Sequence, residues 1–401
     1  MQPYLTARLS LMMFLQFFIW GAWYVTVGNY MAANGLSEVI HWAYTVGPVS
    51  ALISPFVVGN LADRFFSTEK VLVVLNLLAG VAMLAAAQVG GASAPLFIGL
   101  LFLHTICFFP TIGLTSTLCF HNMNHPEKQF PRVRMFGSIG WIAAGVLASL
   151  VLGADETALP LHIAGYSALV MGVYCLSLPA TPPKGAAVGV TWRQRLGLDA
   201  FDLLKKRPFL VFALCELLIS IPLSTYYAYA PVYINAAGIP DPGFQMSFGQ
   251  MTEVLFMFFM PWVLLRLGVK RMILVGFVAW VLRFAFLAAA APGSVYAFIL
   301  IGILLHGICF DFVYIAGQIF VDRQVTPATR GQAQGLLVML RSGIGLLTGA
   351  QFAGWLFNVL LDGDLTRMPA WQLFWAIPGV MALVILLGFA AYFNEKETVK
   401  A

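Results

Sequence analysis

Apolar runs about 20 residues long recur along the whole of this 401-residue chain, separated by short polar or charged breaks. An α-helix needs a run of that length to cross the hydrocarbon core of a bilayer. Charged residues make up only 10% of the chain, against about 25% in soluble domains, so most of its surface must face lipid. The pattern predicts an all-α membrane protein with twelve transmembrane helices, at 9–31, 40–61, 71–89, 95–120, 133–152, 160–179, 209–236, 244–265, 272–290, 295–320, 331–357 and 371–393.

Basic residues are concentrated in the breaks on one side of the predicted membrane. Arg8, Lys70 and Lys205 are examples, whereas the loops on the other side offer only Arg367. Because lysine and arginine are enriched in cytoplasmic loops, both termini are predicted to be cytoplasmic, in a bacterial inner membrane. The net charge of +5 is thus explained by basic residues in the cytoplasmic loops. It does not indicate nucleic-acid binding, and we do not expect nucleic acid as a partner.

The longest internal break divides the predicted spans into two sets of six. We predict an N-terminal six-helix bundle at 1–180, a cytoplasmic linker at 181–207 and a C-terminal six-helix bundle at 208–401. Within the linker, LGLDAFDLLKK (196–206) has the apolar spacing of an amphipathic helix that lies on the membrane surface.

The two halves resemble each other in sequence. HTICFFP at 104–110 matches HGICFDF at 306–312, an offset of 202 residues, and Arg64 aligns with Arg266 at the same offset. An internal repeat of this size is typical of transporters built from two pseudo-symmetric bundles.

Several segments resemble those of a known family. In GNLADRFF, the residues Gly59, Asp63 and Arg64 resemble the Gly-x-x-x-Asp-Arg loop of the major facilitator superfamily, which helps to hold its outward-facing state. FLQFFIWGAW, FPRVRMFGSIG, QMTEVLF, AWVLRFAFLA and FDFVYIAGQIFVDRQVTPATRGQAQG look like segments of the bacterial nucleoside:proton symporters, in the same order. The resemblance implies the major facilitator fold and a carrier that imports nucleosides by proton symport, through alternating access around a central site, without a cofactor other than protons.

Three carboxylates lie inside predicted spans: Glu216, Glu253 and Asp311. Each costs about 2.5–3.5 kcal/mol at the centre of a membrane helix, so its presence indicates a function. Glu253 shares a helix face with Gln250, and a proton-coupled carrier of a polar solute needs a titratable group beside hydrogen-bonding groups. The resemblance implies substrate contact and proton coupling at Gln250 and Glu253; the alternative for Glu253 is a neutral hydrogen bond that fixes helix packing.

In the N-terminal half, Arg134, Ser138 and Trp141 form one stripe on a predicted helix. Arg134 could pair with an acid, Ser138 could bond a ribose hydroxyl, and the Trp141 ring could stack on a base. The resemblance implies that all three line the nucleoside site, although Ser138 and Trp141 replace a threonine and a phenylalanine of the best-known pattern. The alternative is that Arg134 anchors the helix at the cytoplasmic edge and that Trp141 is an interface aromatic.

The seventh span departs from the family pattern. Leu223 and Tyr226 stand where some members carry glutamine and asparagine, so the pocket is expected to be more aromatic, and the preferred base is left open. Tyr226 and Tyr227 are the deepest tyrosines here and are candidate substrate contacts. The alternative for each tyrosine is packing or a place at the membrane interface.

In the tenth span, His306, Phe310 and Tyr314 recur at four-residue steps and are candidate substrate contacts. Phe310 is the candidate for stacking on the base. His306 could titrate near neutral pH, but His104 occupies the equivalent place in the other half, which favours a shared packing role equally.

Asp311 and Glu253 are specific to the C-terminal half. At the repeat offset they correspond to Phe109 and Ala51, so the fold does not require either carboxylate. We therefore predict that proton chemistry is confined to this half. Asp311 is either a proton-linked partner of Glu253 or the counter-ion of a buried arginine.

Two arginines, Arg283 and Arg341, also lie within predicted spans. Each is expected to extend to the membrane surface or to pair with Asp311 or Glu216. Glu216 lies near the cytoplasmic end of its span, where a structural contact is expected.

Other functions are also considered. A carrier of another neutral solute, such as a sugar or a nucleobase, would share the fold. An enzyme is disfavoured because the sequence holds no H-E-x-x-H, no G-x-S-x-G and no phosphate-binding glycine-rich loop, and a receptor because no long soluble segment is present. We expect a monomeric transporter whose partners are a purine or pyrimidine nucleoside, protons and the lipid bilayer.

Overall fold

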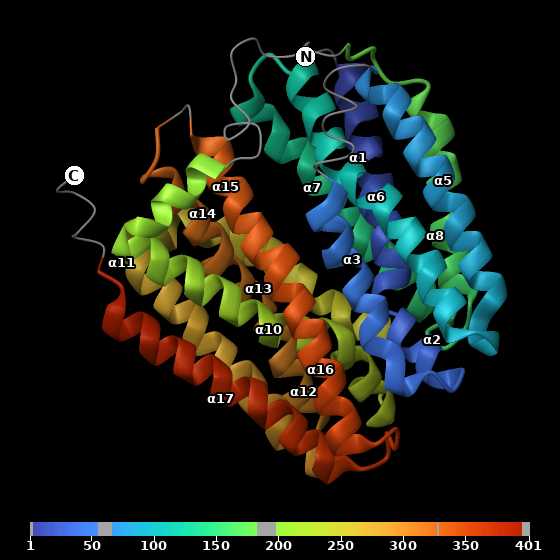
Figure 1. Ribbon diagram of the computed structural model, residues 1–401, viewed down its shortest axis with the longest axis vertical. Helices are drawn as coiled ribbons and strands as arrows, with labels where there is room; N and C mark the ends of the chain where they lie inside the picture. Colours follow the sequence, from blue (N-terminus) through green and yellow to red (C-terminus); the bar gives the residue numbers. More distant parts are fainter. Residues whose placement is uncertain (1–2, 55–65, 183–197, 327–328, 395–401) are drawn as a thin grey trace. The chain divides into compact units, whose positions relative to one another are not determined.

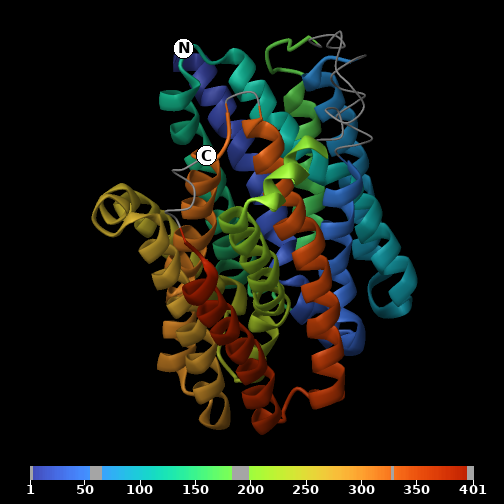
Figure 2. The ribbon, with the colours of Figure 1, turned by 60° about the vertical axis from the view of Figure 1, so that its left-hand side comes forward.

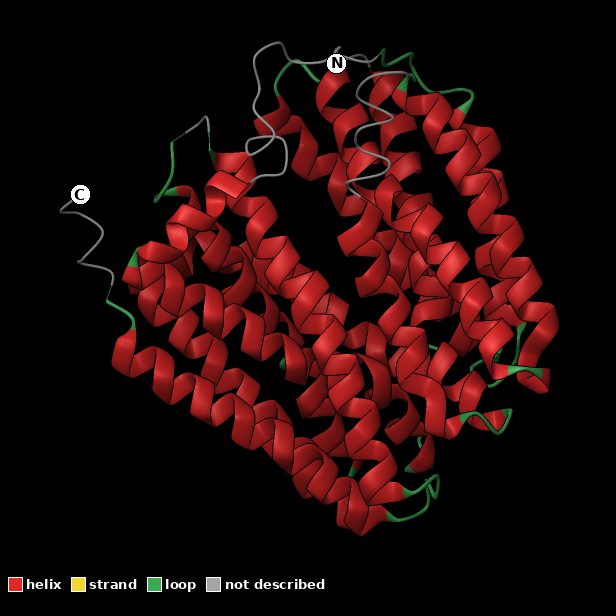
Figure 3. Ribbon diagram, viewed as in Figure 1, coloured by secondary structure: helices red, strands yellow, loops and turns green. Residues whose placement is uncertain are grey.

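The computed structural model describes four stretches of the chain, 3–54, 66–182, 198–326 and 329–394. Every regular element in these stretches is a helix, and none of the residues in them forms a strand (Figure 3). The predicted loop residues Gly59, Asp63 and Arg64 lie outside the described residues.

The chain falls into two compact units. Unit 1 comprises Met1–Val188 with Asp241–Phe244, and unit 2 comprises Gly189–Pro240 with Gln245–Ala401. Unit 1 holds α1 (Pro3–Tyr24), α2 (Val27–Ala33), α3 (Ile40–Ser54), α5 (Thr68–Val89), α6 (Ala94–Asn122), α7 (Pro126–Gly145), the π turn η4 (Val146–Val151) and α8 (Leu159–Cys175).

Unit 2 contains longer and more interrupted helices. Its described residues include two further π turns, η7 (Asp311–Ile315) and η8 (Met339–Gly345), each within a membrane-length helical segment. The elements are the 3₁₀ helix η5 (Leu198–Lys205), α10 (Arg207–Ala236), α11 (Pro242–Ala290), α12 (Tyr296–Leu304), α13 (His306–Phe310), η7, α14 (Ala316–Asp322), α15 (Arg330–Val338), η8, α16 (Leu346–Leu361) and α17 (Met368–Tyr392).

Nine helical segments of the described chain are long and apolar enough to cross a membrane. One of them, Pro242–Gly293, contains two of the predicted spans, because Gly268 has φ 69° and ψ 171° and interrupts the helix there. The apolar helix α8 has 17 residues, and α3 is described only to Ser54. Counting these, the described helices correspond to the twelve predicted spans.

Helix ends follow the local sequence. Proline occupies the first turn of α6, α8, α10 and α17, where it has no amide hydrogen to leave unbonded. At the start of α6, the amide of Leu96 also donates to the Ser93 hydroxyl at 3.4 Å. The linker residues from Leu198 form the 3₁₀ helix η5, and its place on a membrane surface stays a prediction.

In unit 1, α1 packs on α7 and α8, and α5 packs on α6 and α8 (Figure 1). The core between them is apolar and includes Met12, Phe108 and Met171, all buried. Glycine permits a close crossing of α1 and α7: a Cβ atom at Gly21 of α1 would stand 3.0 Å from the Cα atom of Trp141 on α7. This crossing fixes the backbone that carries Trp141.

In unit 2, α10 lies beside α16 and α17 (Figures 1 and 2). Small residues line the contact: a Cβ atom at Gly349 would stand 2.6 Å from that of Ser224, whose hydroxyl donates to the Leu346 carbonyl at 3.0 Å. On the other side of α17, Val380 and Val384 are 61% and 62% exposed, as expected for a helix face in lipid.

Candidate functional site

The predicted stripe of unit 1 lies on α7 against α1. The guanidinium of Arg134 stands 3.9 Å above the ring of Phe17, and the Trp141 ring meets the edges of Trp20 at 5.3 Å and Tyr24 at 6.0 Å. Arg134, Ser138 and Trp141 are all partly exposed. The stripe therefore presents a cation, a hydroxyl and an aromatic edge from one helix.

Trp20 is a candidate that sequence reasoning did not single out. It is partly exposed, its ring contacts Trp141 and Phe109 at 5.3 and 5.4 Å, and its indole Nε1 has no hydrogen-bond partner in the described chain. A signal was present in the four-residue spacing of Trp20 and Tyr24, and Trp20 lies within FLQFFIWGAW, a segment that the family resemblance already included.

In unit 2, Glu253 of α11 and His306 of α13 lie together. His306 Nε2 is 3.8 Å from Glu253 Oε2, and the imidazole stacks on Tyr226 of α10 at 5.9 Å with an interplanar angle of 19°. The imidazole also meets Tyr227 at 5.9 Å and Phe310 at 5.7 Å. Glu253 is 21% exposed and His306 only 1%, so the carboxylate lies on the accessible side of this cluster.

A close helix crossing holds this pair in place. The amide of Gly307 donates to the Thr252 hydroxyl at 3.2 Å, which ties the start of α13 to α11. A Cβ atom at Gly307 would stand 2.5 Å from the carbonyl carbon of Thr252 and 2.7 Å from the amide nitrogen of Glu253. Only glycine therefore allows the two backbones to approach this closely beside Glu253.

Replacing Gly307 with alanine is expected to destabilise the protein by about 1–3 kcal/mol, the usual cost of overpacking. The added methyl group meets backbone atoms, which cannot move away as a side chain can. The matched control is Gly388→Ala in α17, whose methyl group would meet no other atom within 4 Å. Melting temperatures of the two purified variants measure the difference, and equal shifts would contradict the close crossing.

The two histidines of the sequence repeat have different surroundings. His104 Nδ1 donates to the Ala79 carbonyl at 2.9 Å, and its ring stacks on Phe108. Neither ring nitrogen of His306 has a hydrogen-bond partner in the described chain. The shared packing role considered from the sequence therefore fits His104, whereas His306 faces an acid.

Asp311 begins the π turn η7 and is fully buried. Neither carboxylate oxygen has a hydrogen-bond partner in the described residues, where no ion pair joins it to an arginine either. Glu253 is the charged group that acts electrostatically on it. Of the two roles considered for Asp311, this environment favours a link to Glu253 over a counter-ion.

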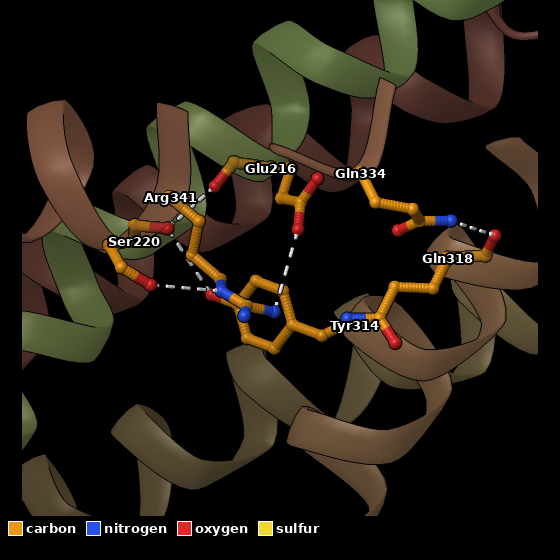
Figure 4. Close-up of polar contacts among 7 residues, drawn as sticks. Glu216, Ser220, Tyr314, Gln318, Gln334 and Arg341 are labelled. Atoms are coloured by element: carbon orange, nitrogen blue, oxygen red, sulfur yellow. Dashed lines mark hydrogen bonds and ion pairs between the residues drawn. The ribbon is translucent and has the colours of Figure 1, made fainter. Parts of the chain in front are cut away.

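The two buried arginines have different partners. Arg341 Nη1 is 3.8 Å from Glu216 Oε1, so Glu216 is the acid that pairs with it (Figure 4). Arg283 is fully buried, donates from Nε to the Gly302 carbonyl at 3.1 Å and lies 4.0 Å above the Tyr226 ring. Arg283 thus supports the ring on which His306 stacks.

Unit 2 thus contains a partly exposed carboxylate beside an imidazole that has no hydrogen-bond partner in the described chain, and a second, buried carboxylate on which the first acts electrostatically. Partly exposed hydrogen-bonding and aromatic groups, Gln250 and Phe310, lie on the same helices. Such a set can bind a polar neutral solute and take up a proton.

Comparisons with known proteins agree with this geometry. The family model described as nucleoside H⁺ symporter matches residues 4–398. The Escherichia coli protein YegT is 36% identical over 98% of this chain and 94% of its own, and the E. coli xanthosine permease is 29% identical over 98% and 97%. The crystal structure of the nucleoside transporter NupG superposes with a TM-score of 0.85 at 27% identity, over 97% of this chain and 99% of that one. The predicted twelve-helix major facilitator fold is thereby confirmed.

Proposed function

Because the chain belongs to the nucleoside H⁺ symporter family and is therefore a transporter, not an enzyme, we propose that Glu253 and Asp311 couple nucleoside movement to proton movement. The protein imports nucleosides by alternating access, as a monomer in a bacterial inner membrane with both termini cytoplasmic. It uses protons as the coupling ion and needs no other cofactor.

The observation that carries this proposal is the pair of Glu253 and His306. A carboxylate at membrane depth is costly, so its presence indicates a function. Here the carboxylate of Glu253 lies 3.8 Å from an imidazole that has no hydrogen-bond partner among the described residues. Asp311 places a second acid within electrostatic reach of Glu253. Two acids that interact electrostatically oppose each other's charge, so the pair can take up and release a proton as its surroundings change.

Substrate contact is assigned to the partly exposed side chains. In unit 1 these are Arg134, Ser138 and Trp141, and in unit 2 they are Gln250, Tyr227 and Phe310. The rings of Trp141 and Phe310 offer stacking surfaces for a base, and the polar groups suit ribose hydroxyls. Three further residues that were predicted to contact the substrate are buried. We propose that they position the exposed contact residues; they are Tyr226, His306 and Tyr314.

Uptake of radiolabelled uridine into proteoliposomes tests the proposal. With an inward proton gradient, uridine is expected to accumulate above its external concentration, and collapsing the gradient with a protonophore should abolish the accumulation. Unlabelled adenosine should compete, whereas ribose and free bases should not. Accumulation without a gradient would contradict coupling, and competition by ribose or a free base alone would reassign the carrier to another neutral solute.

A further inference from the structure

Arg341 is an arginine at the edge of the unit 2 cluster. It lies in the π turn η8 and its side chain is 16% exposed, whereas its partner Glu216 on α10 is only 1% exposed. The guanidinium carbon stands 4.9 Å from the ring centre of Tyr314 (Figure 4). It stands 6.0 Å from the ring centre of Phe310. The arginine is thus next to the ring proposed to stack on a base.

The ion pair with Glu216 leaves much of the guanidinium unused. At 3.8 Å the pair is too long for a hydrogen bond, and neither Glu216 oxygen accepts one within the described chain. Within the described residues, the guanidinium makes one further and long hydrogen bond, from Nε to the Ser342 hydroxyl at 3.4 Å. Since a guanidinium carries five N–H donors, most of them remain available on its accessible side.

Glu216 also sets the charge of this site. The buried carboxylate balances the arginine from the protein side, so the pair as a whole is neutral. A neutral solute can then approach the guanidinium without bringing a counter-charge into the membrane. Nearby, Ser220 bonds to Tyr314 at 3.4 Å between hydroxyls, and Gln334 donates to the Gln318 carbonyl at 2.9 Å, so these polar groups are already engaged (Figure 4).

A guanidinium has N–H donors and no acceptor, so it recognises a base through the hydrogen-bond acceptors on the edge of that base. The edge of a 6-oxopurine presents two adjacent acceptors, O6 and N7, which fit the forked donors of arginine. Adenine presents an amino donor in place of O6, and that group opposes an arginine donor. Gln250, which can both donate and accept, makes no such distinction.

We propose that Arg341 determines base selectivity, favouring nucleosides of 6-oxopurines, such as inosine and guanosine, over adenosine. The proposal rests on the proposed nucleoside transport and adds the class of base preferred. Arg341 donates hydrogen bonds to the O6 and N7 edge of the purine base, while Phe310 stacks on the face of that base.

Inosine and adenosine form the matched pair of probes, since they share the ribose and differ at the six-position. The concentrations of each that halve labelled uridine uptake are measured in proteoliposomes for wild type, Arg341→Gln and Arg341→Lys. Wild type is expected to prefer inosine by about 5- to 150-fold, the discrimination typical of a bidentate base contact. Arg341→Lys keeps the charge but loses the fork, so the preference should shrink. Arg341→Gln should remove or reverse it, because glutamine matches the adenine edge.

Two further variants separate selectivity from folding and from surface charge. Glu216→Gln combined with Arg341→Gln removes both charges together, so that no buried acid is left unpaired, and it too should lose the inosine preference. Arg266→Gln removes an exposed arginine that stands 4.3 Å above the Trp262 ring, and the inosine-to-adenosine ratio should stay that of wild type.

The outcomes distinguish this proposal from the one on which it rests. If folded Arg341 variants transport uridine with an unchanged inosine-to-adenosine ratio, the selectivity role is overturned and nucleoside transport stands. If neither nucleoside competes in wild type and uridine is not carried, both proposals fail.

Discussion

Glu253→Gln is expected to abolish concentrative uptake while leaving exchange of nucleoside across the membrane intact. Glutamine keeps the size and hydrogen-bonding capacity of the side chain but cannot carry a proton. A membrane potential of about 100 mV supplies about 2.3 kcal/mol for each proton, which supports about 50-fold accumulation. The variant should therefore fall from that ratio to about 1, a full loss of the driving force.

Two assays on the same proteoliposomes separate coupling from binding. Proton-driven accumulation of labelled uridine should vanish, and counterflow against preloaded unlabelled uridine should persist. The matched control is Glu156→Gln, the same chemical change at an exposed position outside the helices, which should behave as wild type. Undiminished accumulation by Glu253→Gln would exclude this residue as the proton carrier.

Asp311→Asn is expected to give a folded carrier that exchanges nucleoside but does not concentrate it. Asparagine has nearly the same shape, and the structure records no hydrogen bond to either oxygen of Asp311 in the described residues, so little packing is lost. The variant lacks the second acidic group that interacts electrostatically with Glu253. Burying a neutral amide also costs less than burying a charge, so the melting temperature should not fall.

The melting temperature and the two transport assays together decide the role of Asp311. Loss of folded protein would revive the role of a structural counter-ion. Normal accumulation in a folded variant would remove Asp311 from proton coupling and leave Glu253 as the sole described candidate.

The fold was predictable because span length and polarity are local properties. The predicted span 209–236 corresponds to α10, Arg207–Ala236, and the span 371–393 to α17, Met368–Tyr392. The π turns η7 and η8 were not predicted, since hydrophobicity alone does not distinguish a π turn from an α-helix.

The acidic residues of the candidate site could be predicted from the sequence, but the pairs that charged residues form there could not. A carboxylate in an apolar run stands out at once, and so Glu253 and Asp311 were found from residue types. The partner of Arg341 depends on how α10 packs beside η8, and Glu216 lies far away in the chain. Trp20 had a signal in its four-residue spacing with Tyr24, but its contact with the Trp141 ring depends on how α1 packs on α7.

The π turn that begins at Asp311 also changes the register of the internal repeat. A π turn holds about one residue more than an α turn at similar rise. The matching helix of unit 1, α6, is a continuous α-helix from Ala94 to Asn122. The offset of 202 therefore holds as far as Asp311, and beyond the turn structurally equivalent positions should lie 203 apart, so that Gln318 corresponds to Thr115. An alignment of the two halves thus needs its gap inside a membrane helix and not in a loop.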